Sequence, residues 1–122
     1  MTWIELILWV LLAMIPVGEP TVGQATYYHP SLIGGIMRDG TPYESSNPFI
    51  AAVGGDSQGQ PSIPLGTWLL VRSDDGIYLL IQVRDTGRFP KGDIDLSSSG
   101  FERLAPLSRG RIGITWQKLG IP

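Results

Sequence analysis

The sequence has 122 residues, no Cys and one His, and its nine Lys and Arg residues nearly balance eleven Asp and Glu residues. This length allows one small domain. The absence of Cys excludes disulfides, thiolate metal sites, Cys nucleophiles and the acylated N-terminal Cys of a bacterial lipoprotein. Because no basic stripe is present, nucleic acid is not an expected partner, since phosphate neutralisation supplies most of that affinity.

Metal and cofactor sites are also not expected from the composition. A single His cannot build a multi-histidine zinc site. A calcium site made of carboxylates alone is left open as an alternative, although the acidic residues do not follow the spacing of an EF-hand loop. Sixteen Gly and ten Pro residues indicate an all-β domain with many turns.

Residues Trp3 to Val17 form an almost uninterrupted apolar run in which Glu5 is the only charged side chain. The run is short for a membrane-spanning helix of about 20 residues, and its length suits the core of a signal peptide, although no basic residue precedes it. We expect an apolar N-terminal helix that acts as a signal or anchor segment, with a buried helix of the domain as the alternative. Residues 1–22 are therefore assigned to this segment and its linker, which contains Gly18 and Pro20.

Residues 23–119 are predicted to form the folded domain, in which short strands alternate with turns. The Asp74-Asp75-Gly76 sequence between two apolar runs predicts a hairpin. Strands are expected at residues 23–28, 49–53, 66–73, 76–85 and 111–119, and those at 66–73 and 76–85 are the clearest. Long loops are expected at residues 34–48 and 54–64.

One short helix is predicted from Ser97 to Ala105, because Ser97 or Ser99 can cap its start and Pro106 ends it. Several short strands with one helix favour a small closed barrel, since closure removes exposed sheet edges.

The most conspicuous polar cluster lies in residues 83–97. Asp85 ends a strongly apolar strand, so its carboxyl is expected at the barrel rim, where desolvation would favour a general acid. Asp93 and Asp95 flank Ile94, so on an extended chain they share a face and Ile94 points inward. The structural alternatives are that Asp85 accepts loop N–H groups and that Asp95 caps the helix. Arg88 is a candidate for binding substrate.

A second cluster combines aromatic and polar residues near the first strand and in the long loop. Thr26, Tyr28, Tyr43 and Glu44 are its candidate site residues, because aromatic rings at a loop-lined rim suit the flat faces of sugar rings. Alternation along a strand would place either Tyr27 or Tyr28 in the core, and this alternative stays open.

Several segments, in order, resemble the RlpA-like (rare lipoprotein A) double-psi β-barrel, a relative of the bacterial expansin barrel. They are GQATYYHP, DGTPYESSNPFIAAV, IPLGTWLLVRS, IQVRDTGRF, DIDLSSSGFERL and GRIGITW, and they extend over about residues 23–118. The resemblance implies an all-β fold: a six-stranded double-psi β-barrel with one short helix and a groove across its face.

Active RlpA proteins are lytic transglycosylases of peptidoglycan, and the resemblance implies the same chemistry here. Asp85 would protonate the glycosidic oxygen, while Asp95 or Glu44 would stabilise the oxocarbenium-like transition state. However, Thr41 and Val53 stand where the family has an active-site Glu and His.

These two replacements favour an alternative function, a non-catalytic expansin-like module that binds or loosens wall glycan. The expansin resemblance rests on Thr26, Asp85 and Asp95. A third hypothesis, a protease-inhibiting barrel, ranks last because such inhibitors tend to carry disulfides. We expect a monomer outside the cytoplasm that binds peptidoglycan or a related polysaccharide and meets the membrane only through its N-terminal segment.

Overall fold

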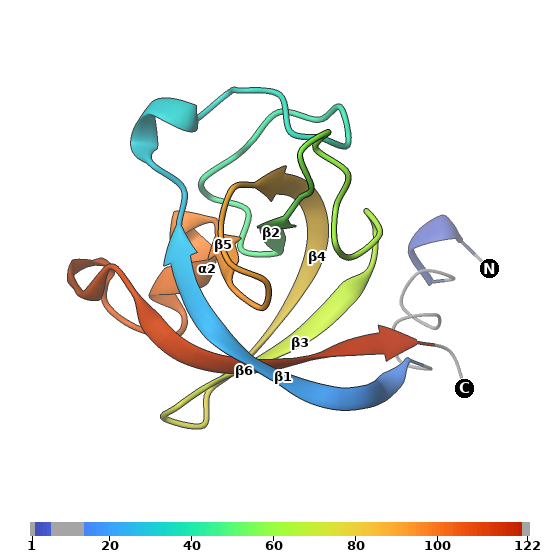
Figure 1. Cartoon of the computed structure of the whole chain (residues 1–122), viewed down its shortest axis with the longest axis vertical. Helices are drawn as coiled ribbons and strands as arrows, with labels where there is room; N and C mark the ends of the chain where they lie inside the picture. Colours follow the sequence, from blue (N-terminus) through green and yellow to red (C-terminus); the bar gives the residue numbers. More distant parts are fainter. Residues whose placement is uncertain (1, 6–13, 121–122) are drawn as a thin grey trace.

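The computed structural model describes residues 2–5 and 14–120, and in these residues six strands close into a barrel (Figure 1). Around the barrel the strand order is β1-β5-β2-β4-β3-β6. The β1–β5 and β2–β4 pairs are parallel, and the other four are antiparallel. The strands are β1 (Ile15–Tyr27), β2 (Ile50–Gly54), β3 (Trp68–Ser73), β4 (Tyr78–Gly87), β5 (Ile94–Leu96) and β6 (Ile112–Gly120). The predicted all-β barrel of six strands is confirmed.

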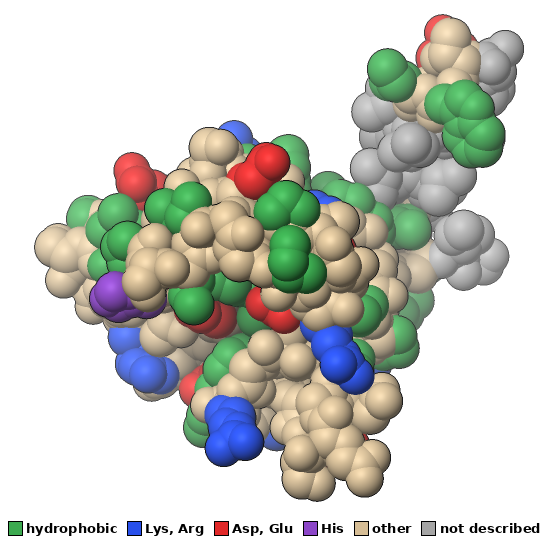
Figure 2. Space-filling view, turned by 90° about the horizontal axis from the view of Figure 1, so that it is seen from above, with side chains coloured by type: hydrophobic (Ala, Val, Ile, Leu, Met, Phe, Trp, Pro, Cys, Tyr) green, Lys and Arg blue, Asp and Glu red, His purple; other side chains and the backbone are tan. Residues whose placement is uncertain are grey.

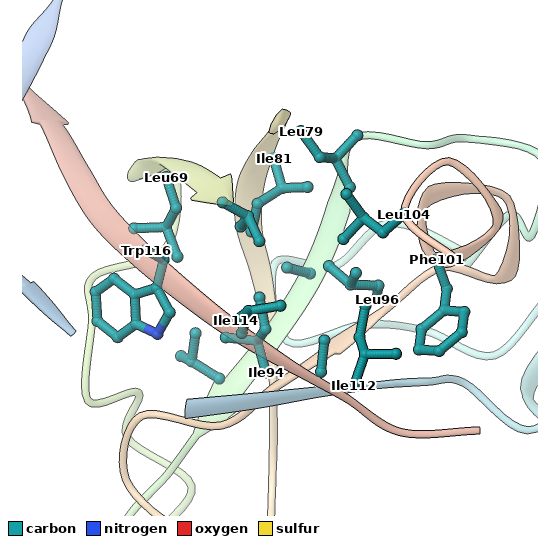
Figure 3. Close-up of a cluster of buried hydrophobic side chains, with 14 of the residues drawn as sticks. Leu69, Leu79, Ile81, Ile94, Leu96, Phe101, Leu104, Ile112, Ile114 and Trp116 are labelled. Carbon is teal, nitrogen blue, oxygen red and sulfur yellow. The ribbon is translucent and has the colours of Figure 1, made fainter. Parts of the chain in front are cut away.

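The barrel interior is filled by aliphatic side chains from alternate positions of the strands. Leu69, Val71, Ile81 and Val83 are all completely buried. Phe101 of α2 (Ser98–Glu102) packs in the same cluster (Figure 3). Each fully buried side chain of this kind contributes roughly 1.5–3 kcal/mol. The core therefore holds together strands that are far apart in the sequence.

The predicted hairpin and the helix cap are both confirmed. At the β3–β4 turn, Ser73 donates its backbone N–H to the Ile77 carbonyl at 2.8 Å, and Gly76 has a φ of 83°. The Ser97 hydroxyl accepts the N–H of Gly100 at 3.1 Å. The helix ends at Glu102, before the predicted Ala105, because the chain tightens into a turn there.

The chain also forms two short 3₁₀ turns, η1 (Pro30–Leu32) and η2 (Leu107–Arg109). The first comes shortly after β1, in the long loop that connects β1 to β2 (Figure 1). This loop contains one isolated bridge, between Ile36 and Pro42.

The first strand begins earlier than the sequence predicts. Ile15–Val17 pairs with the end of β6, and the register shifts between Val17 and Thr21. Gly18, with a φ of 76°, lies in this irregularity. The Gly and Pro residues that suggested a linker therefore belong to a strand irregularity, because β6 is long enough to pair on both sides of it.

The predicted N-terminal apolar helix falls largely on residues 6–13, which lie outside the described residues. Trp3–Glu5 is helical, whereas Ile15–Val17 is strand. No helix within residues 2–5 and 14–120 has both the length and the apolar character needed to cross a membrane.

The closest backbone approach in the barrel yields a stability prediction. A Cβ on Gly23 would lie 2.6 Å from the carbonyl carbon of Gly92 and would overlap its oxygen. Gly23→Ala is therefore expected to destabilise the fold by about 1–3 kcal/mol, measured by thermal unfolding. Gly120→Ala is the control, because its Cβ would meet the methyl groups of Val17 at an ordinary 3.5 Å. Equal melting temperatures for the two variants would contradict the prediction.

Candidate functional site

Two of the predicted acidic residues lie in one row across four adjacent strands. Asp85 on β4 pairs with Ala52 on β2, Ala52 pairs with Asp95 on β5, and Asp95 pairs with Thr26 on β1. These four residues are called the acidic row below. Because neighbouring strands lie about 4.8 Å apart, the Cα atoms of the two acidic residues are roughly 10 Å apart.

A β-bulge in β4 determines where Asp85 points. Ala51 pairs with Val83, but the next residue, Ala52, pairs with Asp85, so Arg84 is an extra residue in β4. Asp85 is two positions after the buried Val83, so in a regular strand its side chain would face the barrel interior. The bulge instead turns Asp85 to the outer side, where Ala52 also packs.

Both carboxylate oxygens of Asp85 accept hydrogen bonds from the protein. The Tyr28 hydroxyl donates to Oδ2 at 2.7 Å, and the backbone N–H of Arg38 donates to Oδ1 at 2.8 Å. Burial and the hydrogen bond to Asp85 raise the pKa of Tyr28 above its ordinary value of 10.0, so its hydroxyl stays a donor. Asp85 thus joins the two ends of the loop formed by residues 28–38, called the 28–38 loop below.

Asp95 lies in a different environment, although it belongs to the same row. The Thr26 hydroxyl donates to its Oδ1 at 2.9 Å. Burial raises the pKa of Asp95 above 3.8, and the negative charge of Asp85 adds to this effect, while the Thr26 hydrogen bond opposes it. Asp95 is partly exposed, and it keeps its proton to a higher pH than an ordinary Asp.

Tyr28 and Tyr43 do not lie open at a rim, contrary to the sequence-based expectation. Their rings stack with centroids 4.2 Å apart, and their exposed fractions are 5% and 2%. Together with Met37, Ile50 and Ala52 they form a second apolar core between the barrel and the long loop. Tyr28 is thus buried in this second core, whereas its neighbour Tyr27 is partly buried against Phe101 of the barrel core. The physical reason is that the loop folds back over the outer face of the barrel.

Glu44 and Arg88, the other two predicted site residues, are exposed at the surface. Sequence reasoning also missed a polar cluster that ties the long loop to β4. Arg84 Nε donates to Asp39 Oδ2 at 2.8 Å, and Arg84 Nη2 donates to the Thr41 hydroxyl at 2.9 Å. Hydrogen bonds from Thr41 and Arg84 lower the pKa of Asp39, although partial burial opposes them. The bulge that places Arg84 beside this loop has no signal in the sequence.

The end of the barrel under the long loop presents acidic side chains near the middle of its surface, and Lys and Arg side chains lie around them (Figure 2). A separate cleft of about 360 Å³ lies between the start of β1, the end of β6 and residues 91–93. Trp116 and Val53 line this cleft. The lining of this cleft does not include the acidic row. Asp85 and Asp95 of the row are instead partly exposed beside the long loop.

The raised pKa of Asp95 predicts how stability depends on pH. Above 3.8 the folded protein resists losing a proton that the unfolded chain loses freely, so wild type loses stability as pH rises through this range. Asp95→Asn removes this cost and can still accept the Thr26 hydrogen bond. We expect the variant to have a higher melting temperature at pH 7, with the difference shrinking as pH falls toward 3.8. A difference that does not change between pH 4 and pH 7 would contradict the assignment.

No protein-family model matches the chain. A papain inhibitor of Streptomyces mobaraensis is 35% identical over 113 residues, which cover 86% of this chain and 76% of that protein. Among solved structures, the Streptomyces papain inhibitor superimposes with a TM-score of 0.68 and 32% identity, covering 85% of this chain and 97% of that chain.

Bacterial expansin is the second kind of relative. Apo expansin from Clavibacter michiganensis has a TM-score of 0.67 and 26% identity, and the match covers 85% of this chain and 52% of that one. A variant of Clavibacter michiganensis expansin is known in complex with cellohexaose. The chain therefore spans about half the length of this expansin.

The comparisons support a non-catalytic expansin-like barrel better than a lytic transglycosylase. The protease-inhibitor hypothesis gains support, because this chain, which has no Cys, is 35% identical to a papain inhibitor. By identity and coverage, this chain belongs to the family of the Streptomyces papain inhibitor.

Proposed function

We propose that the protein binds cell-wall polysaccharide outside the cytoplasm, without cleaving it, through the acidic row. The observation that carries this proposal is the partly exposed Asp95. Oδ1 of Asp95 accepts the Thr26 hydrogen bond, so Oδ2 of Asp95 can accept a hydrogen bond from a sugar hydroxyl. A hydrogen bond to a charged group contributes about 1.5–3 kcal/mol. The expansin solved with cellohexaose supports the same class of ligand.

Three features of the site argue against catalysis. The oxygens of Asp85 both accept hydrogen bonds from the protein itself, whereas a general acid must direct a proton toward the glycosidic oxygen. Val53, at the position where the RlpA resemblance expects His, is buried in the barrel core. Thr41, at the position of the family Glu, bonds to Asp39 and Arg84.

The remaining predicted residues take supporting roles in this proposal. Arg88 and Glu44 are exposed and available to a polymer that extends beyond the row. Tyr28 and Tyr43, being buried, act by holding the loop and Asp85 in place instead of stacking on sugar rings. We propose a monomer that requires no cofactor and has peptidoglycan or a related polysaccharide as its partner.

Sedimentation with insoluble cellulose and with peptidoglycan tests this proposal. Wild type is expected to sediment with at least one of the two polymers. Asp95→Ala is expected to weaken binding about tenfold, which corresponds to the loss of about 1.4 kcal/mol. Asp75→Asn is the control, because this exposed carboxylate lies in the β3–β4 turn, outside the acidic row.

A separate incubation with soluble glycan distinguishes binding from cleavage. Mass spectrometry of glycan strands stripped of their stem peptides is expected to show no new anhydromuramyl or reducing ends after incubation. The release of anhydro products by wild type would restore the transglycosylase hypothesis. Failure to sediment with either polymer would overturn glycan binding.

A second candidate function is inhibition of a papain-like cysteine peptidase. The family relationship favours it, because the match covers 97% of the Streptomyces papain inhibitor chain. We expect the folded protein to inhibit papain in a concentration-dependent manner, measured as the rate of hydrolysis of a small fluorogenic substrate. The absence of inhibition at a large molar excess would exclude this function for papain.

A further inference from the structure

An exposed apolar patch lies at the tip of the 28–38 loop. Leu32, Ile33 and Ile36 are exposed by 48%, 56% and 72% of their surface, and they are called the apolar tip below. The loop projects from the end of β1 (Figure 1), and hydrophobic side chains gather beside the single His in the view from above (Figure 2). Single exposed aliphatic residues are common, but a cluster on one projecting loop indicates an interaction surface.

The loop that carries the apolar tip is held by its own backbone hydrogen bonds. Leu32 donates to the His29 carbonyl at 3.0 Å, and Gly35 donates to the Leu32 carbonyl at 2.9 Å. The tip is also tied to the later part of the long loop, because the backbone N–H of Gly34 donates to the Tyr43 carbonyl at 3.0 Å. A loop that is already ordered loses little conformational entropy when it binds a partner.

Asp85 anchors both ends of this same loop. It accepts hydrogen bonds from the Tyr28 side chain and the Arg38 backbone, which are the first and last residues of the loop. The apolar tip is therefore displayed from a fixed base on the barrel. Cleavage of a peptide bond in the tip would leave both of its ends attached to Asp85, so a peptidase would not easily release them.

The chemistry of the tip suits an apolar protein cleft and not a polysaccharide. No ionisable side chain occurs from Pro30 to Met37. Gly34 and Gly35 follow the two adjacent aliphatic residues, and a Cβ on Gly34 would meet no atom within 4 Å, so a partner backbone can approach closely here. Ile33 has an extended backbone, with φ of −58° and ψ of 127°.

We propose that the apolar tip enters the substrate cleft of a papain-like cysteine peptidase. This proposal rests on the inhibitor function proposed above, and it identifies the surface that makes the contact. The tip combines exposed aliphatic side chains, an extended residue and a glycine pair on a rigid base. Leu32 and Ile33 fill apolar subsites of the cleft, and the glycine pair lets the backbone pass close to the peptidase.

Inhibition of papain by matched variants tests this assignment. Ile33→Ser is expected to raise the inhibition constant at least tenfold, because the variant loses the aliphatic surface that the cleft of papain would bury. Ile77→Ser is the control, since Ile77 is exposed by 44% in the β3–β4 turn. It is expected to inhibit like wild type. Both variants should keep the wild-type melting temperature, which excludes misfolding as the cause of any loss.

The outcomes of this experiment distinguish a wrong contact surface from a wrong inhibitor function. Inhibition by wild type that is weakened in Ile33→Ser and unchanged in Ile77→Ser supports the assignment. Equal inhibition by wild type and Ile33→Ser would overturn the apolar tip and leave the inhibitor function intact, with another surface responsible. Absence of inhibition by wild type would overturn both. Papain whose cleft is blocked by a covalent active-site inhibitor is expected not to bind the protein, and binding to it would contradict insertion into the cleft.

Discussion

The carboxylate of Asp85 is the point on which both candidate surfaces depend. It accepts one hydrogen bond from the Tyr28 side chain and one from the Arg38 backbone, so it closes the 28–38 loop over the outer face of the barrel. The Tyr28 ring of this loop stacks on Tyr43, which comes from the later part of the long loop, and both rings belong to the apolar cluster that contains Ala52. Carboxylate hydrogen bonds are stronger than neutral ones, which explains how one side chain organises a long loop.

The β-bulge at Arg84 makes this arrangement possible. It turns two consecutive polar side chains of β4 toward the loop, where one pairs with Asp39 and the other holds the loop ends. Bulges commonly redirect a side chain beside a functional site. In this protein, the bulge keeps a charged group out of a core in which Ile81 and Val83 are completely buried.

One scaffold thus presents two chemically different surfaces at the same end of the barrel. The acidic row offers carboxylate oxygens, which suit hydroxyl-rich polymers, whereas the apolar tip offers aliphatic side chains, which suit a protein cleft. These two chemistries match the two functions proposed above, which the papain inhibitor and the expansin among the similar proteins support. Function on such a barrel is therefore decided by the loops and the outer face, since the core only holds them in place.

The sequence alone determined the architecture of this protein. Its alternating apolar strands, the Asp74-Asp75-Gly76 turn and the cap at Ser97 are local signals, and each depends on neighbouring residues only. The sequence also placed Asp85 and Asp95 in one polar segment, residues 83–97, and strand pairing brings the two residues into one row across the sheet.

Only the tertiary structure decided what those residues do. The direction of Asp85 depends on a bulge that appears when β4 pairs with β2, and the burial of Tyr28 and Tyr43 depends on a loop that folds back over the barrel. The start of the first strand at Ile15 depends on the length of β6. These features arise from pairing between distant segments, and the local pattern of residues carries no record of that pairing.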